Sequence, residues 1–378
     1  MSTVRSLALA CVLASCAYDA RFDDCAVRCD DASGCPDSFV CGSEGLCRAP
    51  GETQACAAIL GDAGTDGPVP PPPSCVGLAE TCGPIGTDDC CSIATPIPGG
   101  AFFRSYDVAT DGMYSSAIYP ATVSAFVLDK YEVTVGRFRA FVAAGGGTQA
   151  HPPTGGAGAH ARIPGSGWDA SWDGDLVSDA AALGAALQCD AQYQTWTPAP
   201  GTNEDLPINC VTWYEAAAFC AWDGGYLPTE AEWNYAAAGG AEQRAYPWSS
   251  PAGSLTADCA HANYDVDGGP DYCVPGINGA VAAMNRVGSE SPSGDGAWGH
   301  SDLGGNAWEW TLDWYAPSYV DPCADCSNLA SGDHRVIRGG DFSHAEEYMR
   351  TGNRSLSTAD NALPSSRTRD VGFRCARP

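Results

Sequence analysis

Two side chains that can ligate a soft metal ion, His344 and Met349, stand five residues apart near the end of this 378-residue chain. They follow a Gly-Gly pair that ends at Gly340, and Asp341 comes directly after it. Imidazole and thioether groups bind copper and other transition metals. A histidine near a carboxylate can also act as a general base, with Asp341 or Glu347 orienting its ring. The segment therefore predicts either a weak His/Met metal site or an acid–base site.

Other common catalytic motifs are absent from the sequence. It contains no G-x-S-x-G nucleophile elbow, no Walker A motif and no dinucleotide-binding glycine motif. Cys323 and Cys326 form a C-x-x-C pair, but no helix follows that would lower a thiol pKa, so a structural crosslink is expected. The six histidines do not gather in a ligand motif; they are His151, His160, His261, His300, His334 and His344.

Three helices with clear start signals are expected to support this segment. Thr212 begins a Thr-x-x-Glu capping box, and its helix should run to about Trp222. A second box begins at Thr229, and Thr134 can cap a third helix with an apolar face. Alternating apolar and polar residues over 126–133 predict a half-buried strand. Most of the remaining sequence is rich in Gly, Pro, Asp and Ser, which predicts long loops.

The charge of the chain excludes one class of partner. There are 46 acidic and 19 basic residues, which gives a net charge of -27. Such a field repels phosphate backbones, so no nucleic-acid partner is expected. An acidic surface can collect cations such as calcium, but a solvated envelope protein accounts for the same composition.

The N-terminus has the pattern of an export signal. Arg5 precedes a short apolar run over 7–14, which is too short to span a bilayer. The run ends in Leu-Ala-Ser-Cys, which resembles a bacterial lipobox and implies cleavage after residue 15 and lipid attachment at Cys16. Because Ala17 follows the cysteine, we expect a lipid anchor in the outer membrane of the cell envelope. An ordinary secretory signal with an incidental cysteine is the alternative.

The rest of the chain divides into four regions by composition. Residues 16–60 are a small Cys-rich module, 61–74 a Pro/Gly-rich linker, 75–92 a second Cys cluster and 93–378 a Trp-rich main domain. Twenty cysteines in an exported chain predict disulfides. A zinc site in the first module is the alternative, but it lacks paired C-x-x-C units and histidines. We expect the regions before residue 93 to act as a stalk.

The main domain resembles the formylglycine-generating enzyme (sulfatase-modifying factor) family. Seven blocks occur in family order: 129–134 (DKYEVT), 206–213 (LPINCVTW), 227–235 (LPTEAEWNY), 246–248 (YPW), 304–310 (GGNAWEW), 335–340 (RVIRGG) and 371–375 (VGFRC). The resemblance implies an α+β fold of the C-type-lectin-like kind with little regular secondary structure.

The same resemblance implies bound calcium in a structural role. In the family's GNAWEW loop, calcium takes backbone oxygens and one glutamate, and oxygen-only ligation suits calcium. The matching residues here are Asp302, Gly305, Ala307 and Glu309, with Glu309 supplying side-chain oxygens. Core packing of the Trp-Glu-Trp segment is the alternative. A second, less complete calcium site is implied at Asn263 and Tyr264, in a His-Ala-Asn-Tyr segment.

The resemblance also implies one long-range disulfide, between Cys220 in the first capped helix and Cys375. The family's second bridge has lost both partners here. Local bridges are expected among the added cysteines, which are Cys189, Cys210, Cys259, Cys273, Cys323 and Cys326.

The family's catalytic positions are changed in this chain. Family members carry two cysteines five residues apart, which bind copper and oxidise a substrate cysteine to formylglycine. His344 and Met349 occupy those places, and Asp341 replaces a serine. Copper is therefore not expected, and a cell-surface pseudoenzyme that binds a protein, peptide or glycan ligand is predicted. The alternatives are an oxidoreductase with redirected, metal-dependent chemistry at His344, or residual sulfatase-activating activity.

Overall fold

The computed structural model describes residues 71–92, 94–266, 272–276, 283–354 and 362–378, and the backbone of two antiparallel strands, β1 (Val40–Cys41) and β2 (Cys47–Arg48). The chain divides into two units, Met1–Pro70 and Pro71–Pro378. The predicted signal peptide, the predicted lipidation site Cys16 and the side chains of the Cys-rich module lie outside the described residues. Within the described part, no helix has the length and apolarity needed to cross a bilayer.

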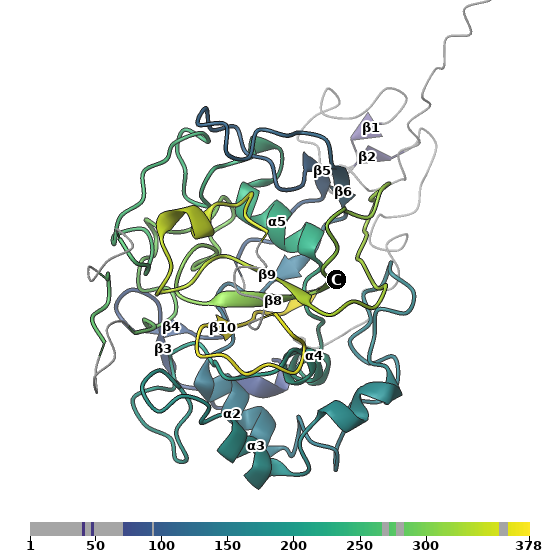
Figure 1. Ribbon diagram of the computed structural model, residues 1–378, viewed down its shortest axis with the longest axis vertical. Helices are drawn as coiled ribbons and strands as arrows, with labels where there is room; N and C mark the ends of the chain where they lie inside the picture. The colour runs from purple at the N-terminus through teal and green to yellow at the C-terminus, as the bar shows by residue number, and fades with distance from the viewer. Residues whose placement is uncertain are drawn as a thin grey trace, which may run out of the picture. The chain divides into compact units, whose positions relative to one another are not determined.

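A three-stranded sheet lies at the centre of the second unit (Figure 1). Its middle strand, β8 (Trp308–Trp314), pairs antiparallel with β9 (Arg335–Arg338) and parallel with β10 (Val371–Gly372). Near the start of β8, Glu309 faces Arg338 at the end of β9, and Trp308 faces Val371 at the start of β10. The register therefore brings the loop after β9 and the loop before β10 to one end of the sheet.

The predicted helices are present, and the capping signals fix their first turns. The helix α2 (Val135–Ala143) is capped by the Thr134 hydroxyl, whereas α4 (Trp213–Trp222) and α5 (Glu230–Ala238) each begin with a complete capping box. A reciprocal box satisfies two of the free N–H groups of a helix start, which explains why these signals are reliable. In Figure 1, α5 lies on one side of the sheet and α2, α3 (Ala180–Ala186) and α4 lie on the other.

The other regular elements are short, so the expected α+β class with little regular secondary structure is confirmed. The predicted strand over 126–133 is reduced to β7 (Val127–Leu128), which pairs with β11 (Ala376–Arg377). The remaining strands are β3 (Glu80–Cys82), β4 (Asp88–Asp89), β5 (Gly100–Phe103) and β6 (Pro120–Val123). Single 3-10 turns are η2 (Pro73–Cys75), η3 (Ala170–Asp175), η4 (Gly240–Glu242) and η5 (Glu346–Met349).

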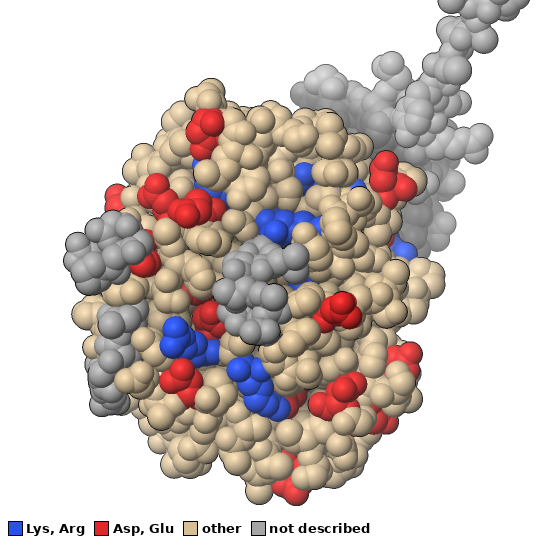
Figure 2. All heavy atoms as spheres, viewed as in Figure 1, with Lys and Arg blue, Asp and Glu red and all other residues tan. Residues whose placement is uncertain are grey.

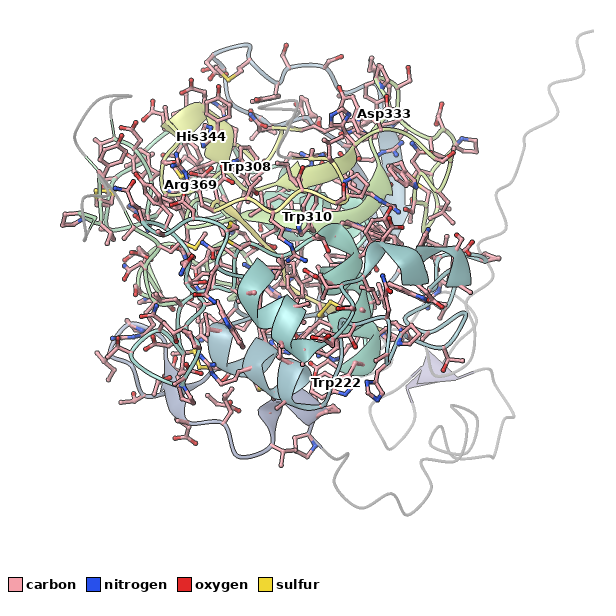
Figure 3. The ribbon with its side chains drawn as sticks, turned by 60° about the horizontal axis from the view of Figure 1, so that its bottom comes forward. Trp222, Trp308, Trp310, Asp333, His344 and Arg369 are labelled. Atoms are coloured by element: carbon pink, nitrogen blue, oxygen red, sulfur yellow. A yellow bond between two sulfur atoms is a disulfide. The ribbon has the colours of Figure 1, made fainter. Side chains whose placement is uncertain are left out.

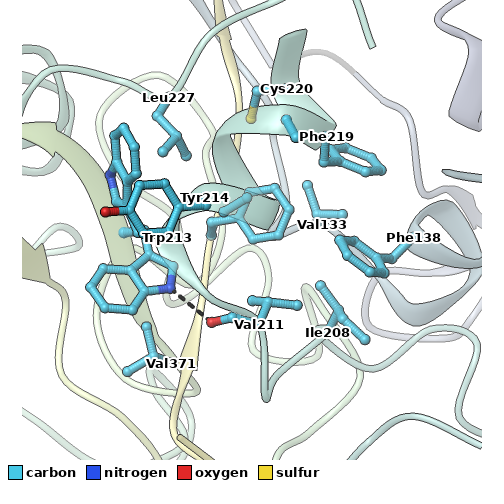
Figure 4. Close-up of a cluster of buried hydrophobic side chains, with 14 of the residues drawn as sticks. Val133, Phe138, Ile208, Val211, Trp213, Tyr214, Phe219, Cys220, Leu227 and Val371 are labelled. Atoms are coloured by element: carbon cyan, nitrogen blue, oxygen red, sulfur yellow. Dashed lines mark hydrogen bonds between the residues drawn. The ribbon is translucent and has the colours of Figure 1, made fainter. Parts of the chain in front are cut away.

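The largest hydrophobic core lies between α2, α4 and the central sheet (Figure 4). It includes several buried tryptophans, and the Trp310 indole donates a hydrogen bond to the Val211 carbonyl at 3.2 Å. A buried cation lies against this aromatic core: the Arg335 guanidinium is 3.4 Å from the Trp213 ring centre and 3.7 Å from that of Trp314. Cation–π attraction helps to offset the cost of burying this charge.

Six disulfides join described residues. The long-range bridge between Cys220 and Cys375 is present and ties α4 to the end of the chain. The expected local bridges are Cys189–Cys210, Cys259–Cys273 and Cys323–Cys326. Near the start of the unit, Cys75 pairs with Cys91 and Cys82 with Cys90.

The second Cys cluster differs from the expectation that residues 75–92 belong to a stalk. These residues are part of the Pro71–Pro378 unit. Just before them, the Ser74 amide donates to the Asp223 carboxylate at 3.0 Å, and the Tyr131 hydroxyl donates to Asp88 at 2.9 Å. Contacts between residues so distant in sequence cannot be inferred from composition, so the composition of this Cys-rich segment alone predicts a stalk.

The acidic residues do not form one continuous patch on the face shown in Figure 2. They lie in separate groups, with basic side chains between them. On this face the acidic groups are therefore interspersed with basic ones.

Candidate functional site

The candidate site begins at the Gly-Gly turn that follows β9. Gly339 and Gly340 have φ angles of 103° and 76°, a backbone region that L side chains rarely adopt. A Cβ atom on Gly340 would also lie 3.1 Å from the backbone nitrogen of Met349. These glycines turn the chain sharply at the end of the sheet, and the next residue, Asp341, is completely buried there.

Asp341 holds His344 by a short hydrogen bond. Its Oδ2 lies 2.5 Å from Nδ1 of His344, while its Oδ1 accepts from the backbone N–H and the hydroxyl of Ser343 at 2.5 and 2.7 Å. The His344 side chain is 23% exposed, so its ring remains partly open to solvent. Two carboxylates, Asp341 and Glu347, were considered from the sequence as groups that orient the His344 ring. In the structure Asp341 is hydrogen-bonded to this ring, whereas Glu347 is exposed.

A second buried carboxylate completes the group. Asp370 precedes β10, and single ligand atoms of Asp341, His344 and Asp370 all lie within 4.8 Å of one another. Burial, followed by the charge of Asp341, raises the pKa of the Asp370 carboxyl to about 6. Asp370 could not be assigned to the site from the sequence, because it is close to His344 only after β9 and β10 have both paired with β8.

Aromatic rings surround His344 (Figure 3). The ring centre of Trp308 lies 6.0 Å away and that of Tyr348 lies 5.0 Å away, both in edge-on arrangements. Arg369 lies at the same end of the molecule in Figure 3, but its guanidinium stacks on the Tyr193 ring at 4.2 Å. The imidazole is thus held by one carboxylate and packed between aromatic side chains.

Met349 occupies a different environment. It is 1% exposed and belongs to a buried cluster with Tyr246, Trp248, Ala262 and Tyr264. A thioether packed in this way behaves as core, since methionine fills irregular apolar gaps. The two residues proposed as a His/Met metal pair therefore have distinct roles, and His344 has Asp341 and Asp370 as its polar neighbours.

Comparison with known proteins agrees with this architecture. Residues 91–378 match the family described as "Sulfatase-modifying factor enzyme 1-like domain". The chain belongs to this family, that of the formylglycine-generating enzymes.

Relatives in the family include both active and inactive proteins by description. A formylglycine-generating enzyme of Streptomyces coelicolor is 31% identical, and the match covers 74% of this chain and 87% of the relative. An "Inactive C-alpha-formylglycine-generating enzyme 2" of Mus musculus is 27% identical over 74% of this chain and 84% of its own length. The solved structure of PvdO from Pseudomonas aeruginosa is 21% identical with a TM-score of 0.49, and the match covers 76% of this chain and 98% of PvdO.

The loop that the family resemblance associates with calcium contains a carboxylate that is already paired. Glu309, the expected side-chain ligand, is fully buried, and both of its oxygens accept from Arg374 at 2.6 to 2.9 Å. The Trp233 indole also donates to Glu309 at 2.8 Å. The charge of this carboxylate is therefore already balanced by a guanidinium.

Uncompensated acidic groups lie nearby instead. Glu132 is fully buried, and its Oε1 has no hydrogen-bond partner among the described residues. Burial and the charges of Asp302 and Glu309 raise the pKa of Glu132 well above its usual range. Burial, followed by the charge of Glu290, raises the pKa of Asp302 to about 7. Glu309, the expected side-chain ligand, is therefore paired with Arg374, whereas burial raises the pKa of Glu132 and of Asp302.

The region implied as a second calcium site lies only partly within the described residues. The backbone oxygen of Asn263 accepts from the Asn306 amide at 2.8 Å, and Tyr264 is buried in the cluster with Met349. The Asn263 side-chain oxygen is buried and has no partner in the described part of the chain. Residues 267–271 and 277–282 lie outside the described residues, so the site stays a prediction.

We expect the titration of His344 to depend on Asp341. Burial lowers the pKa of the imidazole, but the hydrogen bond and charge of Asp341 outweigh it, and the net shift is upward from the ordinary value of about 6.5. The protonated pair therefore stabilises the fold fully below about pH 6.5, and this contribution is lost as pH rises through the folded pKa.

NMR titration of the His344 ring in chelator-treated protein measures this directly. Asp341→Asn should lower the pKa of His344 more than Asp370→Asn, because Asp341 contributes both a hydrogen bond and the nearer charge. An unchanged pKa in Asp341→Asn would show that the 2.5 Å contact does not set the protonation of His344.

Proposed function

We propose that this chain is a family member that no longer converts cysteine to formylglycine. The supporting observation is the environment of the two positions where the family resemblance places thiolates. Met349 packs in an aromatic cluster, and His344 is bound to Asp341. A thioether and an imidazole cannot form the copper–thiolate bonds on which that chemistry depends.

The proposed role is ligand binding at the cell surface. Loops on a rigid, disulfide-linked base are well suited to recognition, and long loops dominate this fold. The ligand classes compatible with such loops are a protein, a peptide or a glycan. A lipid on Cys16 would attach the protein to the membrane of the cell envelope; this part of the proposal rests on the sequence alone. The net charge of -27 disfavours a nucleic-acid partner, because it repels phosphate backbones.

Copper(I) retention tests the loss of the thiolate site. The full chain is equilibrated with copper(I) and a chromophoric copper(I) chelator, with ascorbate as a reductant that leaves disulfides intact. We expect the wild type to lose its copper to the chelator and the variant His344→Cys/Met349→Cys to retain about one equivalent. Stoichiometric retention by the wild type that His344→Ala abolishes would refute the proposal.

A second candidate function is redirected, metal-dependent chemistry. The close approach of Asp341, His344 and Asp370 favours it, because this group combines a partly exposed imidazole with two carboxylates. An enzyme of this kind would show turnover that depends on His344. A non-catalytic binding module would bind its ligand and show no turnover in the same assay.

We also propose structural calcium at the loop that precedes β8. The unbalanced carboxylates of Glu132 and Asp302 support it. Calcium at 100 times its Kd should stabilise the fold by about 2.7 kcal/mol, which corresponds to a rise in Tm on the order of 5 °C. Thermal unfolding with calcium or with EDTA measures the shift, and Glu132→Gln should reduce it. Equal Tm values in calcium, magnesium and EDTA would contradict this proposal.

A further inference from the structure

The sheet topology concentrates metal-ligating groups at one position. Asp341 and His344 come from the loop after β9, and Asp370 comes from the residue before β10. Both neighbouring strands meet the start of β8, and the Trp308 amide donates to the Asp370 carbonyl at 2.9 Å. Among the residues that the structure describes, this is the only group of three or more His, Cys, Asp or Glu ligand atoms within 4.8 Å of one another.

Two of the three ligand groups are buried carboxylates that lie close together. Asp341 is completely buried and Asp370 is 6% exposed. Two buried carboxylates close together repel one another strongly, and a divalent cation between them removes that repulsion.

A buried donor beside the group provides a second observation. Trp308 is 0% exposed, and its indole Nε1 has no acceptor among the described residues. Its ring contacts His344 at a centroid distance of 6.0 Å. A buried N–H without an acceptor costs roughly 1–3 kcal/mol, so such a group points to an additional oxygen ligand at this place. A water or carboxylate bound to a metal ion would supply that oxygen.

We propose that Asp341, His344 and Asp370 bind a divalent transition-metal ion, with zinc(II) or manganese(II) as representative ions. One imidazole and two carboxylates suit borderline metals, whereas copper(I) requires softer ligands and calcium is bound by oxygen alone. Three protein ligands leave coordination positions for water or for an oxygen of a ligand. The inference concerns metal binding alone: it identifies the ligands and the kind of ion for the second candidate function, and it holds whether or not the bound ion takes part in catalysis.

His344 Nδ1 and Asp341 Oδ2 lie 2.5 Å apart, and ligand atoms of all three residues lie within 4.8 Å of one another, so one ion can reach all of them. Calorimetric titration of the EDTA-treated full chain with zinc(II) should therefore give one binding site.

Variants assign the site. His344→Ala and Asp370→Asn should each weaken zinc binding at least 100-fold, whereas His261→Ala should not change it. His261 is the matched control, because its Nδ1 lies 2.7 Å from Asp258 at the same i,i+3 spacing, outside any such three-ligand group in the described structure. Circular dichroism verifies that each variant is folded. Asp370→Asn keeps the shape of the side chain, so it tests the site even if His344→Ala perturbs the loop.

Cobalt(II) absorption separates this site from the cysteines of residues 16–60. Nitrogen and oxygen ligands should give weak visible bands that disappear in Asp370→Asn. Equal metal affinity in the wild type and both variants, or only thiolate-to-cobalt charge-transfer bands, would overturn the proposal. The copper(I) experiment is independent of this result, so failure of one proposal leaves the other unaffected.

Discussion

Replacing Arg374 by methionine is expected to destabilise the domain by about 3–5 kcal/mol, because it leaves the Glu309 carboxylate buried without its counter-charge. Both side chains of this pair are 0% exposed, and Arg374 contacts both oxygens of Glu309. Arg374 also donates to the backbone carbonyls of Lys130 and Ser301 at 3.0 and 2.9 Å. One side chain therefore joins β8, the segment after β7 and the end of the chain.

Urea denaturation measures the loss as a shift of the unfolding midpoint. The control is Arg162→Met, since Arg162 is 51% exposed and lies 3.7 Å from Asp325, and exposed pairs contribute at most about 1 kcal/mol. The double variant Glu309→Gln/Arg374→Met should recover part of the stability, because it removes both buried charges. If Arg374→Met is no more costly than Arg162→Met, the buried pair does not support the fold.

Removing the disulfide between Cys220 and Cys375 should have a similar effect, a loss of about 4–5 kcal/mol. The bridge closes a loop with a sequence separation of 155, and the chain-entropy model assigns the largest stabilisation to long loops. It also holds the C-terminal segment on α4, close to Arg374.

The matched control is the bridge between Cys323 and Cys326, whose sequence separation is 3. Replacing both of these cysteines by alanine should cost about 1–2 kcal/mol on the same loop-entropy scale. Thermal and urea unfolding of the two double-alanine variants compare them directly. Equal losses would mean that loop closure does not determine the contribution of the longer bridge.

Local signals in the sequence were sufficient for the main helices. Thr134, Thr212 and Thr229 each cap the helix that follows them.

The strand predicted over 126–133 is mostly absent because of contacts made in the tertiary structure. Residues on both sides of this stretch are buried, Asp129 and Glu132 among them. After β7 the backbone bonds are irregular, with the Asp129 and Val133 amides donating to carbonyls of the C-terminal segment. The alternating sequence therefore does not form a continuous, half-buried strand.

The candidate site was predictable only in part. The Gly-Gly turn, Asp341 and His344 are local in sequence, and their type indicated metal or acid–base chemistry. Met349 was considered as a ligand because of its chemistry, whereas its burial among aromatic residues could be seen only in the fold. Asp370 joins the site through strand pairing around β8, which no spacing rule encodes.

The central claim is that the family scaffold is retained while its cysteine-oxidising chemistry is lost. The most direct test is a mass-spectrometric turnover assay on the full chain with copper, oxygen, reductant and a Cys-x-Pro-x-Arg peptide. The Streptomyces coelicolor enzyme that is 31% identical serves as the positive control. We predict that the peptide thiol stays unchanged with this chain and is converted with the control. Conversion of the thiol to an aldehyde by this chain would contradict the claim.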